Sequence, residues 1–180
     1  MMTLSNLSIL TGAVYGFLHL PLLVAPALVK RGLAAFPRNR WAGGVLAVVA
    51  LTWSAMEVND MPLGMLDAYK GWLWALGPAV LVLVLVFMDE LLAVRALGGL
   101  LMLAASPVLE TQRLCDTLWT WVPALMAYLW VGAGMVLILS PYRFRHAVER
   151  GCATEGLTRV MGAGGVVMGG LLIALGLLVF

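Results

Sequence analysis

Six apolar runs follow one another along the chain, each close to the length that crosses a lipid bilayer. They cover 7–29, 41–58, 71–88, 91–109, 118–140 and 160–180. A spanning helix needs roughly 20 apolar residues, because it rises about 1.5 Å per residue. Asp89 and Glu90 alone separate the third and fourth runs, which predicts a tight turn. We therefore expect an all-α membrane protein with six transmembrane helices.

The composition excludes an ordinary water-soluble fold. Hydrophobic residues make up 63% of the 180 residues and charged residues 11%. Globular domains carry about 45–50% apolar and about 25% charged residues, and a chain of this size cannot bury so much apolar surface by itself. The formal net charge of +2 does not suggest a nucleic-acid partner. We expect residues 1–180 to form a single transmembrane domain.

The basic residues are distributed unevenly over the two sides that six spans would create. One side receives nine of them: Lys30, Arg31, Arg38, Arg40, Arg95, Arg143, Arg145, Arg150 and Arg159. The other side receives only Lys70 and Arg113. Because basic residues favour the cytoplasmic side, the pattern predicts a multi-pass protein of a bacterial inner membrane with both termini external.

Tryptophans and acidic residues mark the predicted outer side. Two runs open on tryptophan pairs: Trp72 with Trp74, and Trp119 with Trp121. Indole rings prefer the membrane–water interface, so these residues are predicted anchors. The acidic residues on the same side are Glu57, Asp60, Asp67, Glu110 and Asp116.

A short pattern recurs at the start of every second run. An arginine is followed three residues later by a glycine: Arg40 and Gly43, Arg95 and Gly98, Arg159 and Gly162. This recurrence predicts three helical hairpins, about 7–58, 71–109 and 118–180, inserted in the same sense. Such repeats are parallel and are related by an axis near the membrane normal, unlike the inverted repeats of many transporters.

The repeated residues have a physical use in a membrane. The arginines Arg40, Arg95 and Arg159 can anchor each helix start at an anionic inner leaflet. Glycines let neighbouring backbones approach closely. The glycines predicted to pack helices are Gly43, Gly44, Gly98, Gly99, Gly162, Gly165 and Gly169.

The last hairpin resembles a small bacterial two-helix inner-membrane family of unknown function. The matching residues are Pro141, Arg143, Arg159, Gly162, Gly164 and Gly165. They follow that family's order of an apolar helix, a proline with a basic linker, and an Arg-x-x-Gly helix. The resemblance covers roughly the last quarter of the chain, and it implies a membrane hairpin without implying an activity.

His19 is the one histidine within an apolar run, and ionisable groups inside a membrane are candidate functional residues. It could ligate haem or chlorophyll, or relay protons. A bis-histidine haem needs a second intramembrane histidine, however, and His146 lies in a predicted loop. Alternatively, His19 hydrogen-bonds a carbonyl freed by Pro21. The structural role is favoured, and no cofactor or metal is expected.

The basic segment 141–158 has two interpretations. Phe144 and Val148 fall four residues apart with Cys152 following, while the charged residues fall elsewhere on a helical wheel. This spacing fits a short amphipathic helix on the inner leaflet. A plain charged connector fits equally well.

The absence of a catalytic motif favours a non-catalytic role. We expect an accessory or scaffold subunit that contacts lipid and either a membrane-protein partner or a second copy. A small transporter or channel is the alternative, and a pigment- or haem-associated subunit that uses His19 is the next. Transport needs polar residues along a path, and the runs hold few: Thr11, His19, Thr52, Ser54 and Ser106.

Overall fold

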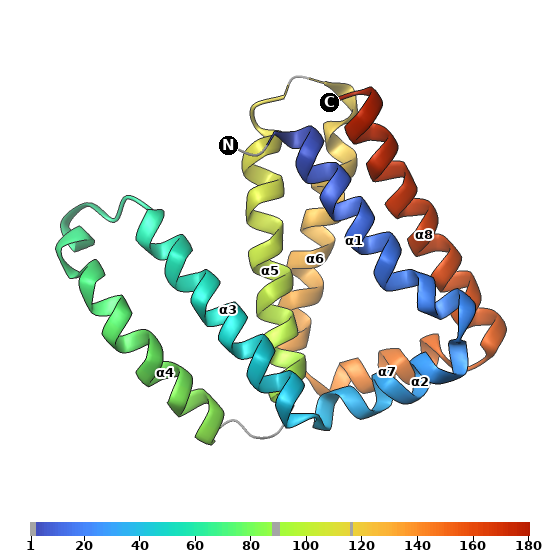
Figure 1. Ribbon diagram of the computed structural model, residues 1–180, viewed down its shortest axis with the longest axis horizontal. Coiled ribbons are helices and arrows are strands. Elements are labelled where there is room, and N and C mark those ends of the chain that lie inside the picture. The colour runs from blue at the N-terminus through green and yellow to red at the C-terminus, as the bar shows by residue number, and fades with distance from the viewer. Residues whose placement is uncertain (1–2, 88–90, 116) are drawn as a thin grey trace.

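The computed structural model describes residues 3–87, 91–115 and 117–180, and these ranges are helical almost throughout (Figure 1). Within these ranges, five segments are long and apolar enough to cross a membrane. They comprise α1 (Leu4–Val24), α3 (Arg40–Asp60), α5 (Leu92–Gln112), α6 (Trp121–Leu139) with the preceding turn η3 (Leu118–Thr120), and α8 (Glu155–Leu178). The chain is therefore an all-helical protein of the membrane class. Asp89, Glu90 and Asp116 lie outside the described residues.

The third apolar run forms a shorter helix than the sequence suggests. α4 (Leu73–Phe87) has 15 residues and follows the 3₁₀ segment η2 (Gly64–Trp72). Its described length is below that of the five candidate spans, so six spans remain a prediction.

Side-chain caps fix where three of the long helices begin. Thr3, Asn39 and Thr154 precede α1, α3 and α8, and each accepts a hydrogen bond from the backbone N–H three residues later. Such caps satisfy donors that the first helical turn leaves unpaired. Neither α5 nor α6 has a side-chain cap.

The first span ends five residues before the predicted end of the first apolar run. Ala25 leaves the helical conformation, with φ −138° and ψ 62°, and Pro26 then starts a second helix, α2 (Pro26–Ala35). Proline suits a helix start, because its missing N–H would be unpaired there. The predicted extent 7–29 was wrong because the residues after Pro26 are still apolar although the helix has turned. A 3₁₀ turn, η1 (Phe36–Arg38), then leads to α3.

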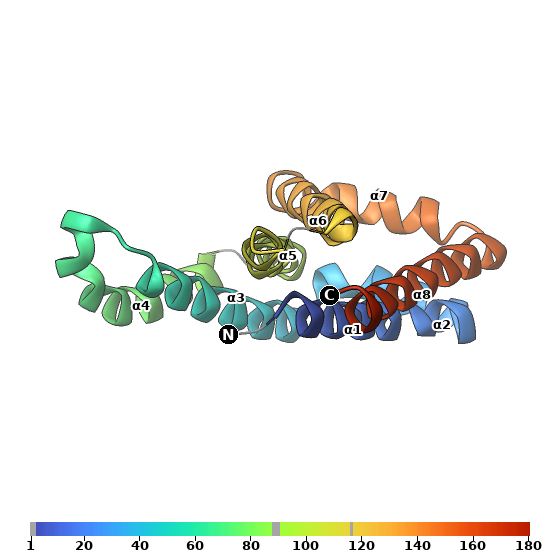
Figure 2. The same cartoon turned by 90° about the horizontal axis from the view of Figure 1, so that it is seen from above.

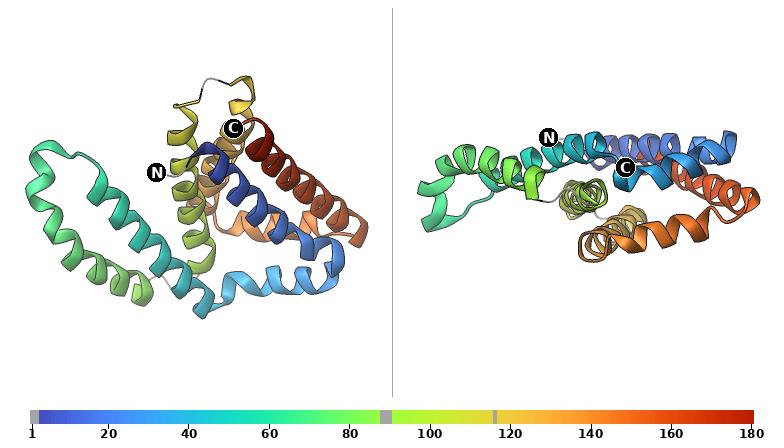
Figure 3. Two further views of the ribbon diagram at one scale, coloured as in Figure 1. Left: turned by 45° about the horizontal axis from the view of Figure 1, so that its top comes forward. Right: turned by 90° about the horizontal axis from the view of Figure 1, so that it is seen from below.

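The basic segment after α6 is a helix, α7 (Tyr142–Gly151), so the helical alternative is the one observed. Phe144 and Val148 are half-buried and Cys152 is buried. The rings of Phe36 and Phe144 lie 5.7 Å apart and join η1 to α7. Figures 1 and 3 show α2 and α7 at the same end of the molecule, where α3, α5 and α8 begin. We call this the basic end.

Three helix pairs run antiparallel (Figure 1): α1 with α8, α5 with α6, and α3 with the shorter α4. α5 also packs along α3 and touches α1, so it connects the pairs. Seen from above, α3 and α4 project to one side of the other helices (Figure 2). Successive spans such as α1 and α3 do not form a packed pair; each instead pairs with a helix from another predicted hairpin.

Candidate functional site

Glycines bring the backbones of two helix pairs into close contact. In the α1–α8 pair, a Cβ at Gly12 would lie 2.6 Å from the carbonyl oxygen of Gly169, and one at Gly169 would lie 2.7 Å from that of Gly12. In the α5–α6 pair, the corresponding distances between Gly98 and Gly134 are 2.7 and 2.6 Å. Any side chain at these positions would force the helices apart.

The glycines predicted to pack helices divide into two groups. Gly43, Gly98, Gly162, Gly165 and Gly169 face a neighbouring helix, and a Cβ at any of them would meet an atom within about 3 Å. A Cβ added at Gly44 would meet only Leu85 Cδ2, at 3.7 Å. One added at Gly99 would meet nothing within 4 Å. The expectation for Gly99 was wrong, because consecutive helical residues point about 100° apart and only one of a pair can face a given helix.

His19 fills the crossing of α1 and α8. Its ring lies against Gly165, where a Cβ would overlap it, and its centroid is 4.2 Å from that of Tyr15. Nδ1 is 2.8 Å from the carbonyl oxygen of Tyr15, four residues back in the same helix. The partner is therefore not the carbonyl of Phe17, which Pro21 leaves without its usual donor. This geometry gives the imidazole a packing role between two helices.

The predicted anchoring residues lie at helix starts. Arg40 and Arg159 are exposed, whereas Arg95 is half-buried and its Nε has no hydrogen-bond partner among the described residues. The tryptophans predicted as anchors are all exposed: Trp72 and Trp74 before and in α4, Trp119 in η3 and Trp121 in α6. Outward-facing side chains are what contact with lipid or interfacial water requires.

Polar side chains within the spans mostly bond to their own helix or to its partner. Thr11 donates to the carbonyl of Leu7 at 2.8 Å, and Ser5 donates to that of Gly176 at 2.6 Å. No group of three or more histidine, cysteine or acidic residues among the described positions is placed to hold a metal ion. These bonds stabilise the helices and their packing.

The end opposite the basic end carries carboxylates beside a cavity of about 470 Å³. Glu57, Asp60 and Glu110 line it, and Glu57 accepts a hydrogen bond from Trp53 Nε1 at 3.0 Å. These acids lie near the ends of α3 and α5. The structure therefore brings together at one end three acids that the sequence analysis assigned to the same side.

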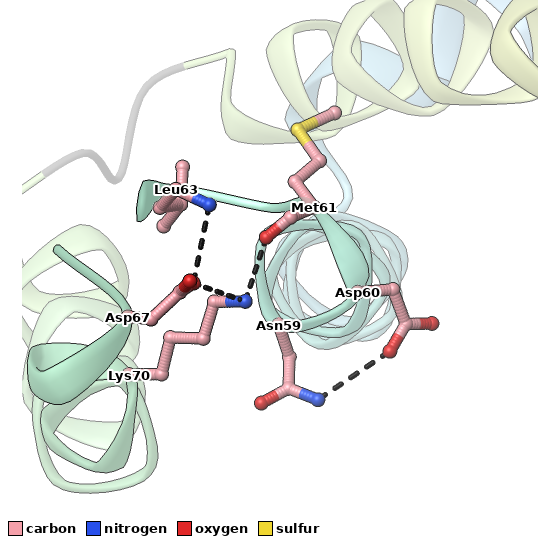
Figure 4. Close-up of polar contacts among 6 residues, drawn as sticks. All are labelled: Asn59, Asp60, Met61, Leu63, Asp67 and Lys70. Carbon is pink, nitrogen blue, oxygen red and sulfur yellow. Dashed lines mark hydrogen bonds and ion pairs between the residues drawn. The ribbon is translucent and has the colours of Figure 1, made fainter. Parts of the chain in front are cut away.

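The adjacent loop between α3 and α4 is held by an ion pair (Figure 4). Lys70 Nζ lies 2.8 Å from Asp67 Oδ1 and donates to the carbonyl of Met61 at 2.6 Å. Asp67 also accepts from the backbone N–H of Leu63 at 3.1 Å. The bond from Lys70, and then that from Leu63, lowers the pKa of Asp67 from its usual value of 3.8.

The basic end presents a cationic surface above a cavity of about 430 Å³ between α2, η1 and α7. Its exposed cations are Lys30, Arg31, Arg38, Arg143, Arg145 and Arg150. Arg145 Nε donates to Glu149 Oε1 at 2.9 Å, and this bond lowers the pKa of Glu149.

A larger groove runs along the first half of α3, with Leu85 of α4 at its edge, and has a volume of about 660 Å³. Its wall is apolar, with Arg40 at the end where α3 begins; the residues that line it are Arg40, Trp41, Gly44, Val45, Val48, Val49 and Leu85. Sequence reasoning placed Arg40 at an interface but missed the groove. The spacing of Trp41, Val45 and Val48 along one helix face was the available signal.

The comparisons with known proteins are negative. No protein-family model, curated protein or solved structure matches the chain.

Proposed function

We propose that the chain is a non-catalytic accessory or scaffold subunit of a larger membrane assembly, in a bacterial inner membrane. Six spans cross the membrane as three hairpins, with both termini external and the basic end in the cytoplasm. The uneven distribution of lysine and arginine supports this orientation. The resemblance of the last hairpin to a two-helix inner-membrane family fits the same proposal.

The observation that carries the proposal is the position of α4 at the edge of the helix array. Among the described residues its extensive helix contact is with α3 alone. The side of α4 that carries Leu76, Val80, Leu83 and Phe87 is exposed at helical spacing. Since helices in lipid are held by packing rather than by hydrophobic burial, an edge helix with one neighbour gains most from a helix supplied by another chain.

Matching contacts in two helix pairs support the proposed repeat. Gly98, three residues after Arg95, contacts Leu137 and Ile138. Gly162, three residues after Arg159, contacts Leu22 and Leu23. Leu137 and Ile138 lie four and three positions before Pro141. Leu22 and Leu23 lie four and three positions before Pro26. Equal offsets on both helices are expected if the hairpins descend from one unit.

Site-specific photocrosslinking in native membranes tests the subunit proposal. A photoreactive residue at Leu83 should trap one discrete polypeptide, and the same residue at Val167, exposed on α8, is the matched control. The partner should also copurify in mild detergent in a fixed ratio. Purification of a fully stable chain with no crosslinked polypeptide at Leu83 would contradict the proposal.

A further inference from the structure

The last turns of α1 and α6 share a sequence pattern. Leucine lies four positions before a proline, and leucine or isoleucine lies three positions before it. Of the eight prolines in the chain, only Pro26, after α1, and Pro141, after α6, follow this pattern. We call the two segments, 22–26 and 137–141, the proline ends.

The two proline ends also have the same backbone geometry. Ala25 has φ −138° and ψ 62°, and Ser140 has φ −137° and ψ 67°. Each of these two residues donates its backbone N–H to the carbonyl four positions earlier, at 2.9 and 2.8 Å. Because proline disfavours the helical conformation in the residue before it, both spans end there. A helix of ten residues then follows in each case, α2 or α7.

Each proline end packs against the start of a helix that begins with Arg-x-x-Gly. A Cβ added at Gly98 of α5 would lie 3.1 Å from Leu137 Cβ and 3.0 Å from Ile138 Cγ1. A Cβ added at Gly162 of α8 would lie 2.9 and 3.1 Å from the equivalent leucines of α1. The same two positions of the proline end therefore contact the same glycine position, and the missing side chain of that glycine permits the close approach.

We propose that the proline end is a helix-recognition surface whose partner is an antiparallel helix that starts with Arg-x-x-Gly. Residues 117–180 dock on the rest of the chain through two copies of this contact: α6 brings its proline end to α5, and α8 brings its glycine to α1 (Figure 1).

The two copies differ in how the chain connects them. A short loop joins α5 to α6, whereas α1 and α8 are separated by most of the sequence. Since the contact is the same in both pairs, it does not depend on a connecting loop. The proposal is independent of the subunit proposal, because it concerns contacts within the chain and not the exposed side of α4.

Cleavage of the folded full chain tests this proposal. A protease site inserted after Leu114, between α5 and α6, allows the purified protein to be cut in mild detergent into 1–114 and 115–180. The cut wild type should stay associated, because both contacts remain. Gly98→Leu and Gly162→Leu should each weaken the association at least about fivefold through overpacking. The double variant should weaken it by about the product of the two factors, measured by pull-down through a tag on one fragment.

A second protease site, inserted after Leu63 between α3 and α4, provides the matched control. With this cut α5 and α6 stay on one fragment, so Gly98→Leu should have little effect on the association of 1–63 with 64–180. Gly162→Leu should weaken that association as before, because α1 and α8 are still on different fragments.

Three outcomes would overturn the proposal. One is separation of the cut wild type, and another is an effect of Gly98→Leu that is equally large with both cuts. The third is a double variant that separates no more readily than either single variant. If a leucine variant fails to fold before cleavage, alanine at the same glycine is the milder test, because its Cβ alone would already meet the partner helix within about 3 Å.

Discussion

The α1–α8 and α3–α4 pairs are both antiparallel, yet they are held together differently. In α1–α8, glycines face one another along the contact, with a Cβ at Gly12 or Gly169 meeting backbone oxygen within 2.7 Å. In α3–α4, a Cβ at Gly77 would meet nothing within 4 Å, and a cavity of about 160 Å³ lies between the helices there. Glycine stabilises a membrane interface only where it lies between two backbones; elsewhere it is merely small.

The largest effect is expected at the closest contact. Gly169→Leu should destabilise the fold by about 1–3 kcal/mol, because the added side chain overpacks an interface already at backbone contact. Gly170→Leu, at a position with nothing within 4 Å, is the neighbouring control and should cost little. Equilibrium unfolding in mixed micelles measures both. Equal losses would mean that α1 and α8 do not pack in this register.

His19 and Gly165 test the same interface through a side chain. Gly165→Leu should destabilise the fold by about 1–3 kcal/mol, since the imidazole occupies the space. Adding His19→Ala should recover part of that loss, and a double-mutant cycle measures the coupling. His19→Gln should leave folding and absorption spectra unchanged. Disappearance of a bound chromophore in that variant would instead make His19 a cofactor ligand.

The loose pair should tolerate what the tight pair does not. Gly77→Leu in α4 should lower the unfolding free energy far less than Gly169→Leu, because Gly77 lines a cavity of about 160 Å³ between α3 and α4 that can take up the added side chain. The same unfolding assay applies. A loss as large as that of Gly169→Leu would show that α4 lies closer to α3 at Gly77 than this structure has it.

The smallest effect is expected in the loop that joins the loose pair. The pKa of Asp67 is lowered in the folded state, so its stabilising effect is complete above the usual value of 3.8 and is lost as the pH falls through the lower folded value. Asp67→Asn should remove this acid-dependent part. The difference in melting temperature between wild type and variant should be smaller at pH 3 than at pH 6. A difference that grows in acid would contradict the assignment.

The sequence predicted the helices better than their partners. Apolar run length located the spans, and the spacing from Arg95 and Arg159 identified Gly98 and Gly162 as contact positions. It did not predict that α1 pairs with α8. Glycine spacing indicates which face of a helix carries small residues, but it does not indicate which helix packs against that face. The end of α1 was also misplaced, since Leu28 and Val29 are apolar beyond the turn at Ala25.

The groove at Arg40 could not be predicted for a related reason. Its edge is formed by Leu85 of α4, and the position of this residue against α3 depends on tertiary packing. Leu81, Val84 and Leu85 of α4 contact a cluster made by Ala47, Leu92 and Ala96, which holds only one side of α4. A tertiary contact thus sets the groove.

The most direct test of the account is the sidedness of the segments that flank α4, the least packed helix. Reporter fusions after Asn39, Leu91 and Ala153 should read cytoplasmic, and fusions after Pro62 and Thr117 should read external. This result would make α4 a sixth span and would give three hairpins inserted in one sense. An external reading after Leu91 would show that α4 does not cross the membrane, and the proposed repeat would fail with it.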